Sequence, residues 1–339
     1  MNERKGIAVA GNMIVDISYP VDRIPKSGEL VPILGEAVRT VGGSVPNVGV
    51  DLAALCPELP VWACGRLGRD AEGELVREYL GRYPNIDRSQ IRDGSATSFT
   101  LVMNETESRQ RTFFTYSGAG ADFCEEDIDL DGIGAEILHV AYILLLPALD
   151  REDAEYGTKM ARLLAHAKER GIRTSVDVVS ESGDRFRRLV PPALRYTDYC
   201  VINELEAEGS TGVALRGEDG ALLPEQMEKA LDALFSLGVS TWAVIHCPEG
   251  AWGKEKGGAL VFEPSIPLPA GYIKGKVGAG DAFCAGVLLG AAKKLALAES
   301  IHLGSAAAVI SMREPGATEG MADLPKVLSL YRELEEAAK

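Results

Sequence analysis

Short apolar runs alternate with amphipathic segments along most of this chain, and that alternation limits the fold more than any other feature of the sequence. The apolar runs lie at residues 7–10, 61–64, 138–144, 174–179, 199–202 and 242–247. Segments with helical spacing lie at 70–80, 151–170, 224–237, 282–295 and 326–338, and Gly171 and Gly238 are placed to end helices. Buried strands that alternate with helices predict an α/β fold in which helices cover a mainly parallel sheet.

Two stretches break this alternation. Residues 14–40 and 98–117 are strand-like, alternate in polarity and are rich in turn residues, with no helix between the strands. Each predicts a pair of antiparallel strands. We expect the two insertions, at about 12–41 and 94–120, to form a small sheet that is a lid on a single domain of residues 1–339. The alternative is that they are extra edge strands.

The charge of the chain argues against nucleic acid as a partner. The formal net charge is −15 and the pI about 4.9, so the positive charge that drives non-specific binding to phosphates is missing. An acidic surface also repels anionic membranes, and the longest apolar run, residues 137–150, is too short to span a bilayer. We therefore expect neither a nucleic-acid nor a membrane partner.

Cysteine use and the N-terminal segment both indicate a reducing compartment. The six cysteines are scattered and form no CxxC pair, which is typical of small buried hydrophobes and does not predict a structural zinc site. The N-terminal residues lead directly into a strand, without the apolar region of a secretory signal. We expect a cytoplasmic protein.

The segment "KGKVGAGDAF" (residues 274–283) carries the clearest chemical signal. Gly278, Ala279 and Gly280 allow a sharp turn, whose N–H groups, with the positive end of the following helix, form a site for a phosphate. Asp281 would repel that phosphate, unless it faces a second substrate and takes a proton from the attacking hydroxyl. The alternative is that Asp281 is only an N-cap. The motif is neither a Walker A loop nor a GxGxxG fingerprint.

Three further segments occur in a specific order around this motif. Residues 41–55 hold a Gly pair that leads into a helix, with Ser44 placed to cap it and Asn47 in its first turn; residues 202–212 begin "INELE"; residues 306–321 hold a helix and a Pro-Gly-Ala turn. Together these segments resemble the ribokinase-like carbohydrate kinase family, the phosphofructokinase B type, over nearly the whole chain. The resemblance implies a three-layer α/β/α fold with a β-sheet lid made from two insertions.

The resemblance also implies roles on the phosphate side of the site. Asp281 would be the general base, and the amides of residues 278–280 would hold the transferring phosphoryl group. Asn203 and Glu206 match the family's Asn-x-x-Glu element, which implies that Glu206 helps to place Mg²⁺, through water. A sparse set of carboxylates is compatible with Mg²⁺, which keeps several of its waters. The alternative for Glu206 is a solvated acidic face.

On the acceptor side, the resemblance implies that Asp16, Gly42, Gly43 and Asn47 bind substrate hydroxyls. The Asp16 carboxylate can accept from two adjacent hydroxyls, and its alternative role is to stabilise a turn. Asp177 lies at the end of a predicted strand, where the family also has an Asp and where ligands bind in open α/β sheets.

Two small residues are expected to bind the nucleotide. Residues 246–252 resemble the strand-to-turn segment that flanks ATP, with Gly250 as the best match, and Ser305 stands where the family often has Asn near adenine. The alternative is that these apolar, small-residue segments only pack in the hydrophobic core.

The chain departs from the family in two places. The usual Asp-Thr before the GAGD motif is replaced by Gly275 and Lys276, which puts activation by a monovalent cation in doubt. We hypothesise that the Lys276 ammonium supplies the positive charge there. The segment "DVVSESGDR" (residues 177–185) replaces the Asp-Pro-Asn of many sugar kinases, which indicates an atypical acceptor pocket.

The second lid segment carries Arg109 and Arg111 beside three aromatic residues. Two Arg at i and i+2 on a strand share a face, so they could bind an anionic group of the acceptor; the alternative is a solvated face. The aromatics suit lid packing or a surface for a homodimer better than a platform for a nucleobase.

We therefore expect an ATP-dependent kinase that phosphorylates a hydroxyl of a sugar or a sugar-like small molecule. Two alternatives stay open at this point. One is a nucleoside kinase of the same family, and the other is a non-catalytic sugar-binding regulatory protein.

Overall fold

The computed structural model describes residues 4–180 and 183–338. Its main sheet has the strand order β16-β15-β14-β13-β12-β9-β1-β4-β5, with β6 also paired to β4. Its strands are β1 (Ile7–Ala10), β4 (Val61–Leu67), β5 (Ile86–Asp87), β6 (Ile91–Asp93), β9 (Ile137–Ile143), β12 (Arg173–Val178), β13 (Tyr199–Asn203), β14 (Trp242–Cys247), β15 (Gly250–Glu255) and β16 (Val261–Pro264). All neighbours are parallel except the pairs β14–β15 and β15–β16. Each of the six predicted apolar strands is confirmed.

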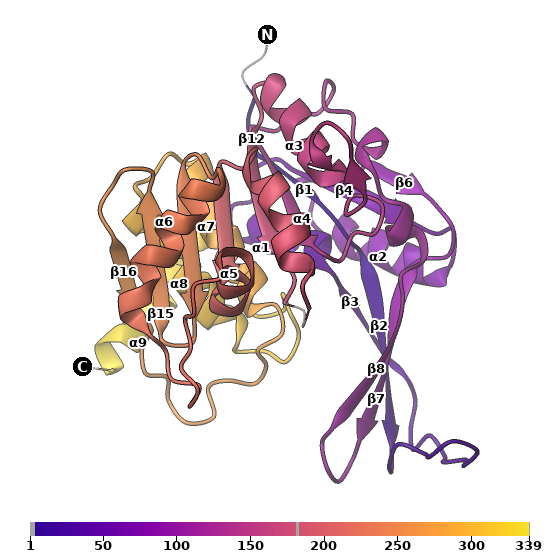
Figure 1. Ribbon diagram of the computed structural model, residues 1–339. Coiled ribbons are helices and arrows are strands. Elements are labelled where there is room, and N and C mark those ends of the chain that lie inside the picture. The colour runs from indigo at the N-terminus through magenta and orange to yellow at the C-terminus, as the bar shows by residue number, and fades with distance from the viewer. Residues whose placement is uncertain (1–3, 181–182, 339) are drawn as a thin grey trace.

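Helices cover both faces of this sheet (Figure 1). They are α1 (Ser44–Leu55), α2 (Ala71–Gly81), α3 (Lys159–Glu169), α4 (Arg185–Leu194), α5 (Glu204–Thr211), α6 (Met227–Leu237), α7 (Ala279–Ala292), α8 (Leu297–Ser311) and α9 (Leu324–Ala337). One buried core joins α1, α2, α7, α8 and α9 to the sheet, and a second core joins α3, α4, α5 and α6 to it. Strand β1 serves both, because Ile7 and Val9 point into the first core and Ala8 and Ala10 into the second. The prediction of a three-layer α/β/α fold is confirmed.

The predicted helix over residues 151–170 is wrong in its first half. A small antiparallel pair, β10 (Glu152–Asp153) and β11 (Gly157–Thr158), precedes α3. The Asp153 carboxylate accepts the N–H groups of Glu155 and Tyr156, which holds a turn, and Gly157 has a φ of 92° that a helix excludes. The helix begins only after Thr158, whose hydroxyl accepts from the N–H of Ala161 and caps it.

A second sheet has the order β3-β2-β7-β8 and stands apart from the first. Its strands are β2 (Ile14–Val21), β3 (Val38–Gly42), β7 (Ser98–Glu105) and β8 (Arg111–Tyr116). The pairs β2–β3 and β7–β8 are antiparallel, and the parallel pairing of β2 with β7 joins the two insertions. Figure 1 shows this sheet projecting from the body, with the turn between β7 and β8 at its far end. We call it the projecting sheet.

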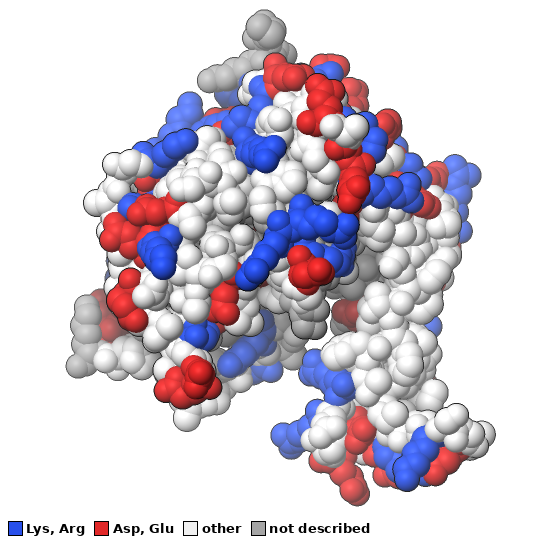
Figure 2. All heavy atoms as spheres, in the orientation of Figure 1, with Lys and Arg blue, Asp and Glu red and all other residues white. Residues whose placement is uncertain are grey.

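Charge is mixed over the face that Figure 2 draws. Acidic and basic side chains are interspersed on the body, whereas much of the projecting sheet between the body and its charged tip is uncharged. Among the described residues, no helix has both the length and the apolar character needed to cross a membrane.

Candidate active site

Asp281 lies in the first turn of α7, at the carboxyl edge of the main sheet. The helix begins at Ala279, three residues earlier than predicted, and its N-cap is Gly278. The interpretation of Asp281 as an N-cap is therefore wrong: it is the third residue of the helix, and its carboxylate turns toward α1 and β9. The side chain is 6% exposed, so it belongs to the interior of the site.

Two neutral donors hold the Asp281 carboxylate. Asn47 Nδ2 on α1 donates to Oδ2 at 2.9 Å, and the Tyr142 hydroxyl donates to Oδ1 at 2.8 Å and to Oδ2 at 2.9 Å. Burial raises the pKa of Asp281 to about 6, against the opposing effect of these hydrogen bonds. A carboxylate with a pKa near 6 is ionised at neutral pH and is a stronger base than an exposed Asp.

Tyr142 is a residue of this site that sequence analysis missed. It lies at the carboxyl end of β9 with a φ of 66°, and Leu144, two residues on, has a φ of 82°. Both values are uncommon for residues other than glycine, so the chain bends sharply where the Tyr142 side chain turns to Asp281. A signal was present in the sequence, because Tyr142 is a lone hydroxyl-bearing residue in the apolar run of residues 137–146.

The turn before α7 requires glycine at Gly278. Its φ is 77°, and a Cβ there would lie 2.7 Å from the Cβ of Ala317. A Cβ on Gly275 would lie 2.6 Å from the carbonyl oxygen of Pro315. The Pro-Gly-Ala turn that the sequence singled out thus packs against the GAGD turn. The N–H groups of the first turn of α7, at Gly280 and Asp281, have no acceptor within the helix and are suited to an anion.

A cavity of about 280 Å³ beside Asp281 brings three carboxylates together. It is lined by Asp281, Asp177 at the end of β12 and Glu206 on α5, among other residues. Burial raises the pKa of Asp177 well above its usual range, with Glu206 and Asp281 as further causes, and burial raises the pKa of Glu206 to about 7. The alternative of a solvated face for Glu206 is wrong, because the residue is 5% exposed.

Asn203 and Glu206 form a capping box at the start of α5. Asn203 Oδ1 accepts from the Glu206 N–H at 2.9 Å, and Glu206 Oε2 accepts from the Asn203 N–H at 2.9 Å. Glu206 Oε1 also accepts from Asn203 Nδ2 and from the Ser180 hydroxyl, both at 2.7 Å. The spacing of this motif therefore has a structural purpose beside any part in catalysis. Ser180 belongs to the atypical segment 177–185, of which residues 181 and 182 lie outside the described residues.

The donor chemistry of this cavity fits Mg²⁺ held through water. All three carboxylates offer oxygen, which Mg²⁺ prefers. Among the described residues, they do not form a group whose ligand atoms lie within 4.8 Å of one another, so a bare ion would not be ligated directly by all three. A cation at this cavity would offset the mutual repulsion that raises the pKa of Asp177.

The predicted acceptor residues lie on the α1 side of Asp281. Asp16 is half-buried on β2, and a Cβ on Gly42 would lie 3.2 Å from its Oδ2. Burial raises the pKa of Asp16, against a hydrogen bond with Thr100. Gly43 is the N-cap of α1 with a φ of 94°, and Asn47 lies one turn later.

Ser44 does not cap α1 as predicted. It is the first residue of the helix, and its side chain makes no capping hydrogen bond there. Instead the Ser44 hydroxyl donates to Asn12 Oδ1 at 3.0 Å, and the Ser44 N–H donates to the same oxygen at 2.9 Å. Asn12, which precedes β2, thereby supports the start of α1 from outside the helix.

The residues that the sequence predicts for the nucleotide side line a larger cavity of about 550 Å³, which we call the nucleotide-side cavity. Gly250, Ser305, Lys276, Phe283 and Tyr331 are among its lining residues. This cavity and the smaller one share Asn203, His246 and Gly280 in their walls. Burial lowers the pKa of His246 to about 4, so its ring is neutral at the junction.

Arg111 is not brought together with the other acceptor-side residues. It begins β8 opposite Asn104, whereas Thr100 pairs with Asp16. The separation of four positions between Thr100 and Asn104 corresponds to about 13 Å of strand. The expectation that Arg109 and Arg111 share a strand face is wrong, because Arg109 lies before β8 in the turn, with a φ of 58°.

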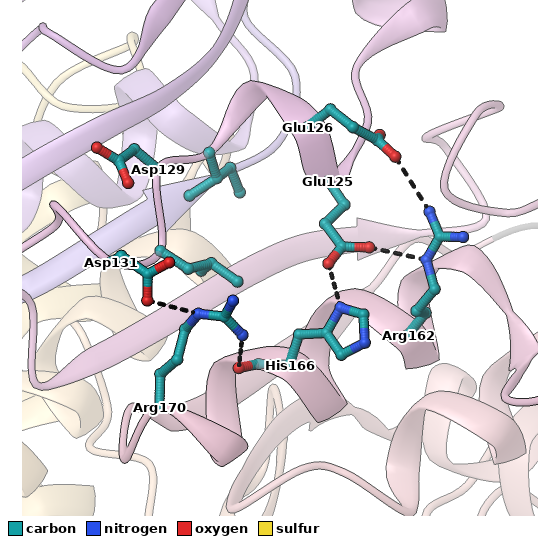
Figure 3. Close-up of a pocket in the computed structure, with 9 residues that line it drawn as sticks. Glu125, Glu126, Asp129, Asp131, Arg162, His166 and Arg170 are labelled. Atoms are coloured by element: carbon teal, nitrogen blue, oxygen red, sulfur yellow. Dashed lines mark hydrogen bonds and ion pairs between the residues drawn. The ribbon is translucent and has the colours of Figure 1, made fainter.

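A separate hollow of about 360 Å³ lies between residues 125–131 and α3, and is lined largely by charged side chains (Figure 3). Arg162 Nε lies 2.8 Å from Glu125, which also contacts His166, and Arg170 Nε lies 2.8 Å from Asp131. Because these charges compensate one another, the arrangement is an ion-pair network that ties the segment to the helix.

One further cluster lies near the nucleotide-side cavity. The ligating atoms of Glu263, His302 and Glu335 lie within 4.8 Å of one another. His302 Nδ1 is 2.8 Å from Glu263, and this hydrogen bond raises the pKa of His302. The hydrogen bond between His302 and Glu263 accounts for the arrangement.

Comparison with known sequences identifies a family. A family profile described as "pfkB family carbohydrate kinase" matches residues 4–324. The chain is 26% identical over 337 residues to a ribokinase of Arabidopsis thaliana, covering 96% of this chain and 81% of that protein. It is 24% identical over 317 residues to the uncharacterized sugar kinase YegV of Escherichia coli, covering 91% of this chain and 88% of that protein.

Solved structures share the fold. The Arabidopsis thaliana ribokinase complexed with ribose and ATP superposes with a TM-score of 0.79 at 22% identity, covering 96% of this chain and 98% of that one. The nucleoside kinase of Methanocaldococcus jannaschii superposes with a TM-score of 0.73 at 18% identity, covering 98% and 100% of the two chains.

Proposed function

Because the chain belongs to the pfkB family of carbohydrate kinases, we propose that it transfers the γ-phosphoryl group of ATP to a hydroxyl of a sugar or a similar polyol, with Asp281 as the general base. The observation that carries the proposal is the position of Asp281. Its buried carboxylate, with a pKa of about 6, lies in the first turn of a helix between acceptor-side residues on α1 and a cavity suited to a nucleotide.

The proposed reaction needs a single proton acceptor on the protein. The substrate hydroxyl gives its proton to Asp281 while the hydroxyl oxygen forms a bond to the γ-phosphorus of ATP. The bond between that phosphorus and the oxygen that bridges it to ADP breaks, and ADP leaves. A carboxylate has about four lone-pair positions; the Asp281 carboxylate accepts one hydrogen from Asn47 and one from Tyr142, which its two oxygens share. The carboxylate therefore keeps room to accept the proton of the substrate hydroxyl.

Charge stabilisation is assigned to the first turn of α7. The N–H groups of residues 278–280 are proposed to face the transferring phosphoryl group at the positive end of the helix, where they would stabilise its negative charge. Of these three, the Ala279 N–H already donates to the carbonyl oxygen of Lys276 at 3.3 Å. Mg²⁺, held by Glu206 and Asp177 through water, would neutralise charge on the phosphates. Lys276, which lines the nucleotide-side cavity, is proposed to add positive charge where many relatives have an acid.

The nucleotide and the sugar are proposed from the relatives and the shape of the site. The Arabidopsis ribokinase structure contains ribose and ATP, and the cavity of about 550 Å³ lined by Gly250 and Ser305 lies in the size range of small-ligand sites. Asp16, with Gly42, Gly43 and Asn47, is proposed to bind the hydroxyls of the acceptor.

The projecting sheet is proposed to be the lid of the site. Asp16, Thr100 and Thr115 are paired across its strands and therefore lie on one face, and the Thr100 and Thr115 hydroxyls are 3.3 Å apart. Closure of that polar face over the acceptor would exclude water, which competes for the phosphoryl group. Arg111 is proposed to reach an anionic group only on an acceptor long enough to extend toward the tip.

The lid is also proposed to form a homodimer surface. Its exposed apolar side chains are Leu30, Ile33, Leu34, Val38, Phe113, Phe114 and Tyr116. Phe114 and Tyr116 alternate with Thr115 and so lie on the face opposite to Asp16. Val38 and Phe113 lie on the same face as Asp16. Exposed apolar side chains that gather on one face are typical of a protein–protein contact, so Phe114 and Tyr116 are the proposed contact. Analytical ultracentrifugation of Phe114→Ser would give a monomer if this face joins two copies.

The deciding experiment is a coupled ADP-release assay with Mg-ATP and a panel of pentoses, hexoses, sugar acids, sugar phosphates and nucleosides, run beside Asp281→Asn. Turnover with one sugar that falls about 10²- to 10⁴-fold in the variant supports the proposal. Turnover with a nucleoside alone would favour the nucleoside kinase, and ligand binding without turnover would favour a sugar-binding regulatory protein. Strong activation by K⁺ over Na⁺ at constant ionic strength would contradict the role of Lys276.

A further inference from the structure

Asp51 is a fully buried carboxylic acid that the proposed reaction does not use. It lies on α1 with 0% exposure, and neither of its side-chain oxygens has a hydrogen-bond partner among the described residues. An ionised carboxylate without a partner is among the least favourable groups that a protein interior can hold. The side chain therefore requires an explanation.

A second unpartnered acceptor lies one helical turn earlier. Asn47 directs its Nδ2 to Asp281, and its Oδ1 is buried and lacks a donor among the described residues. Asn47 and Asp51 are at positions i and i+4 of α1, so their side chains share a face of the helix with Cβ atoms about 5–6 Å apart. Two buried groups whose acceptors lack donors among the described residues thus lie on one face of α1, near the proposed base.

We propose that Asp51 is a positioning residue: it carries a proton, donates a hydrogen bond through it to Asn47 Oδ1, and so holds the Asn47 amide with its NH₂ group toward Asp281. A protonated carboxyl is a donor, so one proton removes the charge of Asp51 and gives Asn47 Oδ1 a partner. An amide whose oxygen accepts a hydrogen bond is polarised and donates more strongly through its nitrogen. The proposal rests on the proposed role of Asp281 as the base.

The surroundings of Asp51 favour the neutral form. The titratable groups that face it are Asp281 on α7, Glu319 in the loop before α9, Tyr79 on α2, and Tyr83 just after α2. Burial raises the pKa of Asp51 well above its usual range, and Asp281 and Glu319 raise it further. A proton on Asp51 also spares Asp281 the repulsion of a second buried negative charge.

Two substitutions separate hydrogen bonding from charge. Asp51→Asn keeps the size and a donor, whereas Asp51→Leu keeps the approximate size and removes the donor. We expect Asp51→Asn to retain kcat within about twofold. We expect Asp51→Leu to lower kcat about two- to tenfold, the usual effect of one lost hydrogen bond, with the KM for ATP unchanged. The acid limb of its pH–rate profile should move to higher pH, because a poorly held Asn47 stabilises the Asp281 carboxylate less.

The opposite result is well defined. If Asp51 were ionised, both substitutions would remove a negative charge near Asp281 and move the acid limb to lower pH, which would overturn the proposal. Equal profiles for all three proteins would also overturn it, since Asp51 would then be only structural.

A measurement independent of activity covers the case in which Asp51→Leu does not fold. The infrared difference spectrum between the wild type and Asp51→Asn at pH 7 should contain the carbonyl band of a protonated carboxyl. The matched control is Asp198→Asn, which removes a buried carboxylate that contacts Lys168 and should show only an ionised band. An ionised band for Asp51 would contradict the proposal. Activity that survives in Asp281→Asn would contradict the role of Asp281 as the base. It would not change the infrared test of whether Asp51 carries a proton.

Discussion

The Tyr142 hydroxyl lies 2.8 Å from one carboxylate oxygen of Asp281 and 2.9 Å from the other, so a single donor from β9 spans the side chain proposed as the base. This hydrogen bond lowers the pKa of Asp281 against the larger effect of burial. It also fixes the plane of the carboxylate, which decides where a substrate hydroxyl can approach it.

Replacing Tyr142 with Phe should therefore shift the acid limb of the pH–rate profile to higher pH. The Asp281 carboxylate loses a hydrogen bond that stabilises its ionised form, so the pKa of Asp281 rises. As a result, kcat at pH 6 should fall more than kcat at pH 8. Tyr196→Phe is the control, because Tyr196 is half-buried away from the site, beside Tyr156. An unchanged limb in Tyr142→Phe would mean that Tyr142 does not act on the base.

The wild-type enzyme should lose activity as the pH falls through about 6. The base must be ionised to accept a proton, and burial raises the pKa of Asp281 to about 6. A profile of kcat/KM against pH, measured with saturating Mg²⁺ and a buffer series of constant ionic strength, reports this value for the free enzyme. A midpoint near 4 would contradict the burial of this carboxylate in the working enzyme.

The Asp281→Asn variant should be more stable than the wild type at neutral pH. The folded-state pKa of Asp281 is raised from 3.8 to about 6, so the stability it contributes is fully present below pH 4 and is lost as the pH rises through 6. The difference between the two pKa values corresponds to roughly 3 kcal/mol at pH 7. Thermal unfolding at pH 4.5 and at pH 7.5 should show the advantage of the variant growing with pH. An advantage that does not depend on pH would have another cause.

Gly278→Ala should damage the phosphate-binding turn more than a similar change elsewhere. Gly278 has a φ of 77° and no room for a Cβ beside Ala317, whereas Gly271 has a φ of 76° and open space. Both substitutions cost about 1–2 kcal/mol of stability, because an alanine must adopt a left-handed backbone conformation. Gly271→Ala therefore controls for this conformational cost. We expect only Gly278→Ala to lower kcat and raise the KM for ATP. Equal kinetics in the two variants would show that the turn tolerates movement.

Ser305→Leu should raise the KM for ATP and leave the fold intact. Ser305 is a half-buried residue of α8 that lines the nucleotide-side cavity, and leucine adds volume there without lowering helix propensity. Circular dichroism and thermal unfolding check the fold, and Ser236→Leu is the control because Ser236 is exposed on α6, outside this cavity. An unchanged KM would place the nucleotide elsewhere.

The sequence by itself determined the six central strands of the main sheet and their order along the chain, because a buried parallel strand needs an uninterrupted apolar run and a helix needs its own periodicity. It did not predict the outer strands β5, β6, β15 and β16. It also determined the GAGD turn, since glycine is required where φ is positive and neighbours crowd the Cβ. The helix boundaries at Lys159 and Ala279 were missed because a capping threonine and a glycine N-cap have weak signals in sequence.

The tertiary structure alone decided which of these segments meet. The parallel pairing of β2 with β7 joins insertions about 80 residues apart, and the contact of Tyr142 with Asp281 joins strand to helix across 139 positions. No local pattern records such contacts, because the free energy of a buried polar group depends on which donors and acceptors the fold places around it. Asp51 is the clearest case: its position four residues after Asn47 is legible in the sequence, but its burial beside the base is a property of the packed molecule.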